Sequence, residues 1–159
     1  HEYYWRGQEW VDYFEQLDMT VLGNEHRVLS RGREDFTLAG VHDLHAARHI
    51  AAHVSDPARA ADGAPEGLRI LLAHPPRSAA EAAETGAYDL QLSGHTHGGQ
   101  YAPFQLMVWL AQPYLAGLHR VSERMQLYVS RGSGYWGPPI RAGAASEITK
   151  ITLTRSATA

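Results

Sequence analysis

Two histidines, His95 and His97, lie at alternate positions in the glycine-rich segment 94–100 (GHTHGGQ), directly after the strand-like run 88–93. Neutral imidazole nitrogens carry exposed lone pairs and are common ligands of divalent metal ions. A strand that ends here presents its next side chains at its carboxyl end, which is where ligand sites form in open α/β sheets. The segment therefore predicts a metal site.

A third histidine, His74, follows a second strand-like run, residues 68–73 (LRILLA). Pro75 and Pro76 come next and prevent the strand ladder from continuing. Because strand ends of one sheet edge lie together, His74, His95 and His97 are expected to converge on one site. The alternative for each is a hydrogen-bonded polar residue on a loop.

Composition limits the remaining chemistry. The chain has 159 residues and no cysteine, which excludes disulfides, thiolate zinc sites and cysteine nucleophiles. A hydrophobic content of 44% fits one compact unit, placed at 1–155, with a short tail at 156–159. A formal net charge of -3 and a single lysine, Lys150, give no electrostatic footprint for nucleic acid. The composition does not indicate a cellular compartment.

Hydrophobic periodicity and turn residues predict alternating helices and strands, which is typical of the α/β class. Helices are expected at 8–17, 42–54 and 78–85, the last with Ser78 as its cap. Strands are expected at 20–22, 26–30, 36–41, 68–73, 88–93, 128–130 and 148–153. Residues 55–67 and 131–145 are rich in glycine, proline and small residues and are interpreted as loops.

Four segments together resemble the calcineurin-like metallophosphoesterases, in particular a membrane-linked branch of that family. They are HEYY at 1–4, ILLAHPP at 70–76, YDLQLSGHTHGGQ at 88–100 and the tail LYVSRGSGYWGPPIRAGAASEITKITL at 127–153. The resemblance covers most of the chain, and the histidine block at 88–100 is its most specific part.

The resemblance implies a four-layer α/β sandwich, of which this chain is the C-terminal portion, with a binuclear metal centre. Two divalent ions (Mn, Fe or Zn) would activate water for in-line attack on phosphorus. His74 and His95 would bind one ion and His97 the other. His1 matches the family histidine that faces the leaving group and donates a proton, and Glu2 is expected to orient it.

The aspartate-bearing blocks that supply the family's bridging carboxylate and most ligands of the first ion do not occur in this sequence. We therefore expect this chain to be inactive by itself, because nothing negative lies between the two ions to offset their repulsion. The missing N-terminal part of the same protein is the expected partner, and without it a sheet edge and an apolar face are exposed. The alternative is a non-catalytic metal-binding or interaction module derived from the same fold.

Two further segments are candidates for substrate contact. Residues 104–118 are apolar on nearly all sides but too short to span a bilayer, so they form either a buried helix or a lid that contacts a membrane. In the loop 131–145, Tyr135 and Trp136 either cap the core or shape a pocket for the organic part of a phosphoester, with Arg131 or Arg141 binding phosphate. A lipid-like or envelope-derived substrate and a membrane-associated parent protein would suit these features.

Two other histidine patterns in the sequence could also bind metal. A terminal His1 could chelate copper, as in copper-dependent polysaccharide monooxygenases, but that chemistry belongs to β-sandwiches rather than to alternating helices and strands. His45, His49 and His53 are spaced by four and would lie near one face of a helix. We interpret them as a solvated helix face, because no carboxylate or strand end converges on them.

Overall fold

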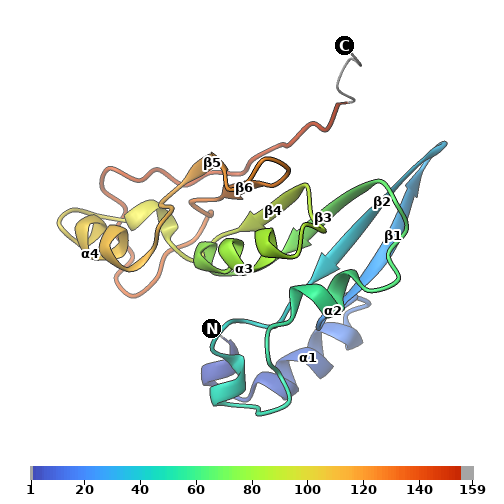
Figure 1. Ribbon diagram of the computed structural model, residues 1–159. Helices are drawn as coiled ribbons and strands as arrows, with labels where there is room; N and C mark the ends of the chain where they lie inside the picture. The colour runs from blue at the N-terminus through green and yellow to red at the C-terminus, as the bar shows by residue number, and fades with distance from the viewer. Residues whose placement is uncertain (1, 155–159) are drawn as a thin grey trace.

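The computed structural model describes residues 2–154, and its centre is one six-stranded mixed sheet in the order β1-β2-β3-β4-β6-β5 (Figure 1). The strands are β1 (Glu25–Arg31), β2 (Glu34–Gly40), β3 (Leu68–Leu72), β4 (Leu90–Ser93), β5 (Gly117–Arg120) and β6 (Gln126–Val129). The inner pairs β2–β3, β3–β4 and β4–β6 are parallel, and the outer pairs β1–β2 and β5–β6 are antiparallel. The predicted α/β class is confirmed.

Four α-helices accompany the sheet within residues 2–154. They are α1 (Gly7–Gln16), α2 (Pro57–Ala61), α3 (Ala79–Glu84) and α4 (Phe104–Ala111). Short 3-10 turns occur at Glu2–Tyr4, Ala46–Arg48, Pro76–Ser78 and His97–Gly99. Figure 1 shows α2 and α3 on the same side of the sheet, and α4 beyond the end of the strands at the opposite end of the molecule from the β1–β2 hairpin.

The core lies between the sheet and the two helices α2 and α3. Small residues of the helices, among them Ala60 and Ala82, pack on Leu71 of β3 and on the apolar side chains of β6. Small side chains allow the helices to approach the sheet closely, and the larger ones fill the remaining space. Tyr88 is buried here, and its hydroxyl donates to the carbonyl of Pro57 at 2.7 Å. The buried polar group is therefore satisfied.

The other face of the sheet is also apolar but is less covered. Leu72 of β3 is 38% exposed and Leu29 of β1 is 40% exposed. These side chains, with Leu22 and Leu38, line one groove on this face. Apolar residues on both faces are typical of parallel strands that are buried on both sides. The expected exposed apolar face is therefore found in the described part of the chain.

The hairpin and the inner strands were predicted well. β1 and β2 pair from Glu25 with Gly40 to Arg31 with Glu34, and Gly32 begins the two-residue turn with a φ of 68°. A positive φ at the start of such a turn is usual for glycine. The predicted strand before His74 and the one before the histidine block are β3 and β4.

The predicted helix at 42–54 is wrong, since only the turn Ala46–Arg48 forms there. The backbone bonds within this segment are mostly single turns between residues three apart, and side chains bond to other backbone groups of the segment. The Asp43 carboxylate accepts from the backbone N–H of His45 at 2.8 Å, and the Asn24 amide donates to the carbonyl of Val54 at 2.6 Å. Such bonds compete with a helical ladder.

The predicted loop at 55–67 contains a helix, α2. Asp56 caps its first turn by accepting from the backbone N–H of Arg59 at 2.9 Å, and Pro57 takes the first helical position. Both are recognised helix-start signals, so the sequence carried the information.

Three smaller expectations are also wrong. Residues 20–22 and 148–153 are not strands, because neither pairs with a neighbour within residues 2–154 and a β-prone segment gains its stability from such pairing. Ser78 does not cap α3 with its side chain. Its hydroxyl turns toward the core instead, donating to the carbonyl of Pro75 at 2.8 Å and accepting from the Gln91 amide at 3.0 Å.

Adjacent leucines of β3 test this description of the core. Leu71 is 1% exposed and Leu72 is 38% exposed. We expect Leu71→Ala to lower the free energy of unfolding by about 2–5 kcal/mol, because it leaves a cavity. The control Leu72→Ala should cost about 1 kcal/mol or less, since it removes less buried surface. Urea unfolding measures both, and equal losses would contradict the assignment of the core face.

Candidate metal centre

Three neighbouring parallel strands end at the same edge of the sheet, and a polar residue follows each of them. His74 comes two residues after Leu72 of β3, and His95 comes two residues after Ser93 of β4. Asp43 comes three residues after the end of β2. The backbone N–H of Gly94 donates to the carbonyl of His74 at 3.1 Å, which ties the ends of β3 and β4 together.

The structure brings His74 and His95 together. The Nε2 atom of His74 lies 3.2 Å from the Nδ1 atom of His95, and the two rings meet edge to face with centroids 4.9 Å apart. Part of His74 remains open to solvent, yet desolvation of its ring and the neighbouring His95 lower its pKa to about 4. Burial also lowers the pKa of His95. Both rings are therefore neutral at neutral pH, which is the form that binds metal.

The distance between the two rings fits a shared metal ion. With a metal–nitrogen distance of about 2.0–2.1 Å, two nitrogens 3.2 Å apart subtend an angle of roughly 100° at one ion. That angle lies between the tetrahedral and octahedral values. The two nitrogens are hydrogen-bonded to each other, so His74 and His95 can become ligands of a single ion when that bond is broken and both lone pairs turn toward the ion.

His97 has different hydrogen-bond partners. The guanidinium of Arg141 donates from Nη2 to the Nδ1 atom of His97 at 3.2 Å. Burial and this positive neighbour lower the pKa of His97. Within residues 2–154, no group of three or more histidine, aspartate or glutamate side chains is arranged to hold a metal ion. His74 and His95 therefore lie together, and His97 shares a second pocket with His95.

The backbone of the histidine turn is unusual. His95, His97 and Gln100 have φ values of 69°, 51° and 52°. Each such non-glycine residue costs about 1 kcal/mol or more, and such strain is found mostly where the surrounding structure imposes it. Gly99 has a φ of 78°, and a Cβ there would lie 2.8 Å from the Cα of Gln105 at the start of α4. Thr96 donates its hydroxyl to the carbonyl of Leu115 at 2.6 Å and holds the turn from the other side.

Gln100 was predicted only as the end of the histidine block, but it connects that block to the loop 131–145, here called the aromatic loop because it carries Tyr135 and Trp136. It is 2% exposed. Its Oε1 atom accepts from the backbone N–H of Trp136 at 2.6 Å, and its Nε2 atom donates to the carbonyls of Trp136 and Pro138 at 2.8 and 3.1 Å. The end of the GHTHGGQ segment is the only signal that could have indicated this role.

Asp43 lies beside these histidines and was not among the predicted site residues. It lines one pocket with His45 and His95, and a second with His42 and His74. Burial lowers the pKa of both His74 and His95, and the negative charge of Asp43 offsets part of this lowering. A carboxylate directly after the third strand end was the available signal.

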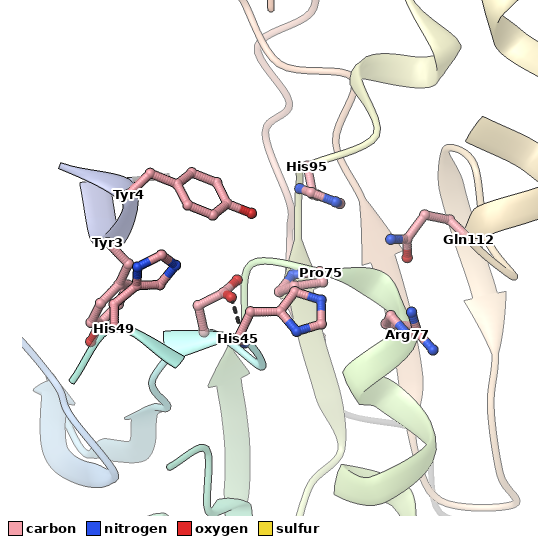
Figure 2. Close-up of a pocket in the computed structure, with 9 residues that line it drawn as sticks. Tyr3, Tyr4, His45, His49, Pro75, Arg77, His95 and Gln112 are labelled. Atoms are coloured by element: carbon pink, nitrogen blue, oxygen red, sulfur yellow. Dashed lines mark hydrogen bonds between the residues drawn. The ribbon is translucent and has the colours of Figure 1, made fainter. Parts of the chain in front are cut away.

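Figure 2 shows the side chains of Tyr4, His45, His95 and Gln112 arranged around one pocket. Asp43 also lines this pocket. The dashed bond in it is the one from the backbone N–H of His45. His45 and His49 both line this pocket. They belong to the irregular segment after β2, so the interpretation as a solvated helix face is wrong.

The third histidine of that pattern, His53, lies in a different cluster. Its Nδ1 atom is 2.9 Å from the hydroxyl of Tyr3, which is also 2.8 Å from Nδ1 of His42. The rings of His42 and His53 stack with centroids 4.1 Å apart and an interplanar angle of 9°. This cluster anchors the turn Glu2–Tyr4, and Glu2 lines one pocket together with His74.

His1 lies outside the described residues, so its role stays a prediction.

The predicted substrate-contact residues lie in one loop but differ in their surroundings. Arg131 lies 3.7 Å from the Glu147 carboxylate. Arg141 donates to the carbonyls of Gly134, Arg131 and Ala144 as well as to His97, so it braces the loop. Tyr135 and Trp136 are 60% and 51% exposed, so the alternative that they cap the core is wrong. Binding of substrate by these four residues stays a prediction.

The apolar segment after the histidine block begins with α4, and none of the helix residues is buried. Leu106, Met107, Trp109 and Leu110 are between 58% and 68% exposed. The alternative of a buried helix is therefore wrong. Among the described residues, no helix has the length and hydrophobicity that a membrane span requires.

Comparison with known proteins gives close relatives but no matching family model. An uncharacterized metallophosphoesterase of Helicobacter pylori strain J99 is 42% identical over 155 residues, which are 96% of this chain and 40% of that protein. A transmembrane protein with metallophosphoesterase domain from Danio rerio is 39% identical over 98% of this chain and 37% of its own length. The phosphodiesterase YaeI of Escherichia coli is 32% identical over 85% of this chain and 47% of its own length. The chain thus spans less than half the length of these relatives, and the predicted resemblance is confirmed.

The proximity of His74 and His95 can be tested without metal. In metal-free protein we expect the His74 ring to titrate near pH 4, and His95→Ala to raise this pKa toward the ordinary value because a neighbouring positive charge and some burial are removed. His119→Ala is the control, since that ring bonds to the carbonyl of Ala116 on another segment. NMR of the imidazole resonances measures the pKa. An ordinary His74 pKa in the unsubstituted protein would contradict the geometry.

Proposed function

We propose, since this chain belongs to the metallophosphoesterase family, that it supplies half of the metal centre of a metal-dependent phosphoester hydrolase. The observation that carries the proposal is the pair His74 and His95, whose ring nitrogens lie 3.2 Å apart at the ends of two parallel strands. Names of the relatives support a phosphoesterase kind of function. The binuclear mechanism goes beyond those names and is part of our proposal.

In this proposal His74 and His95 hold one divalent ion, and His97 binds a second. When bound there, two such ions would supply polarisation of the phosphoryl oxygens and a water of lowered pKa as the nucleophile. The low pKa values of the three rings keep them neutral and available as ligands. To bind metal through Nδ1, His97 would release the hydrogen bond that Arg141 donates to this atom. Imidazole donors suit Zn, Fe and Mn, so they do not select one metal.

Asp43 is proposed as a positioning residue for this pair of histidines. Its carboxylate faces both pockets in which the histidines lie, and the backbone N–H of His45 holds it in place at 2.8 Å. A nearby carboxylate stabilises positive charge at the site and orients the ligand rings. Such partners commonly change metal affinity by about 10- to 100-fold.

The decisive experiment uses the full-length gene product with chromogenic phosphomonoesters and phosphodiesters in added manganese. We expect His95→Ala to lower turnover by at least about 100-fold and to reduce bound metal, because it removes a proposed ligand. His97→Ala should reduce bound metal as well. His119→Ala, on β5, serves as the control and should retain both properties.

Two results would contradict the proposal. Metal binding without turnover of any phosphoester by the unsubstituted protein would favour the non-catalytic metal-binding module. Unchanged metal content in His95→Ala would remove this residue from the site.

The role of Asp43 has a separate test. We expect Asp43→Asn to weaken metal binding by about 10- to 100-fold while the fold is kept, since the amide has the same shape but no charge. Asp43→Glu should restore part of the affinity. Isothermal titration of metal measures both variants, and circular dichroism checks the fold. Equal affinities for Asp43→Asn and the unsubstituted protein would exclude the proposed role.

A further inference from the structure

A pocket next to the metal-site histidines has two chemically different sides. His95 and His97 line one side. Apolar side chains line the other side, and these are Phe104, Met107, Val108, Ala111 and Trp136. Its volume of about 300 Å³ is at the lower end of the range of small-molecule sites.

The apolar wall is held in place by packing within the described structure. Tyr101, Phe104 and Trp136 form a stack, with ring centroids 5.5 and 5.9 Å apart and interplanar angles of 18° and 11°. Gln100 fixes the backbone of Trp136 through two hydrogen bonds, at 2.6 and 2.8 Å. The wall is thus built before any ligand arrives, and a preformed site binds with a smaller ordering cost.

Gln112 adds a polar side chain to the lining of this pocket. It follows the last residue of α4, is 7% exposed and lines both this pocket and the one in Figure 2. Within the described part of the chain, its buried Oε1 atom has no hydrogen-bond partner. An unpaired buried acceptor is unfavourable. Figure 2 shows Gln112 and His95 facing the same space.

The lining also limits the charge of the ligand. No lysine or arginine is among the residues that line this pocket in the described chain, and the histidines lie on one side only. A second phosphate or a carboxylate at the far side would therefore lack a positive partner. An apolar group would be desolvated there at no such cost.

We infer that this pocket binds the apolar alkyl, acyl or aryl group of a phosphoester whose phosphoryl group lies at His95 and His97. The substrate class is thus an amphiphilic phosphoester. This inference rests on the proposed function for the position of the phosphoryl group.

The test measures binding rather than turnover. Alkylphosphonates from methyl to hexyl cannot be hydrolysed at their C–P bond, and isothermal titration follows their binding to the manganese-loaded full-length gene product. We expect the dissociation constant to fall about two- to fourfold per methylene until the pocket is filled, because each methylene leaves water. Met107→Ser should flatten this dependence on chain length. Ala111→Phe, which fills the pocket, should flatten it as well.

A matched control lies one position away. Leu106 is 58% exposed and Met107 is 62% exposed, both are on α4, and Leu106 does not line the pocket. Leu106→Ser should therefore keep the dependence on chain length. A dependence that Leu106→Ser removes and Met107→Ser keeps would overturn the assignment.

The remaining outcomes separate this inference from the proposed function. Equal affinity for methyl and hexyl phosphonate overturns the apolar pocket, while turnover of small phosphoesters by the same preparation leaves the proposed function standing. A chain-length dependence that Met107→Ser removes supports the pocket even where no phosphoester is turned over, and in that case the proposed function alone fails.

Discussion

Parallel pairing of β2, β3 and β4 is the constraint on which the candidate site depends. Gly40 pairs with Leu72, and Leu72 pairs with Leu92, so the three strands end at one level. The segments that follow must leave the sheet at the same edge. His74 and His95 therefore meet although 21 positions separate them along the chain. Without this pairing, their rings would be polar groups on unrelated loops.

The histidine turn links this edge to the rest of the site. Its left-handed residues are held by Thr96 and by the close approach of Gly99 to α4. Gln100 then holds the aromatic loop, which is far away in sequence, next to the histidine turn by accepting a hydrogen bond from the backbone of Trp136. A strained turn of this kind keeps its shape only when neighbours hold it from several sides. The histidine turn, α4 and the aromatic loop therefore form one connected unit.

The two faces of the sheet differ in how completely they are covered. α2 and α3 bury one face around Leu71 and Leu127, whereas Leu72 on the other face keeps 38% of its surface exposed. A sheet that is apolar on both faces is suited to a layered fold with elements on each side. The chain spans about 40% of the length of the relatives from Helicobacter pylori, so this unit corresponds to a part of such a protein.

The sequence by itself determined the α/β class, the hairpin, the strands before His74 and His95, and the resemblance to the metallophosphoesterases. These follow from local patterns and short motifs, which depend on neighbours in the chain. Only the tertiary structure decided that residues 42–54 are irregular, that His97 faces Arg141 and that α4 is exposed. It also placed Asp43 beside the histidines. These outcomes depend on hydrogen bonds and packing between distant segments, whose energies outweigh local propensity and leave no periodic signal in the sequence.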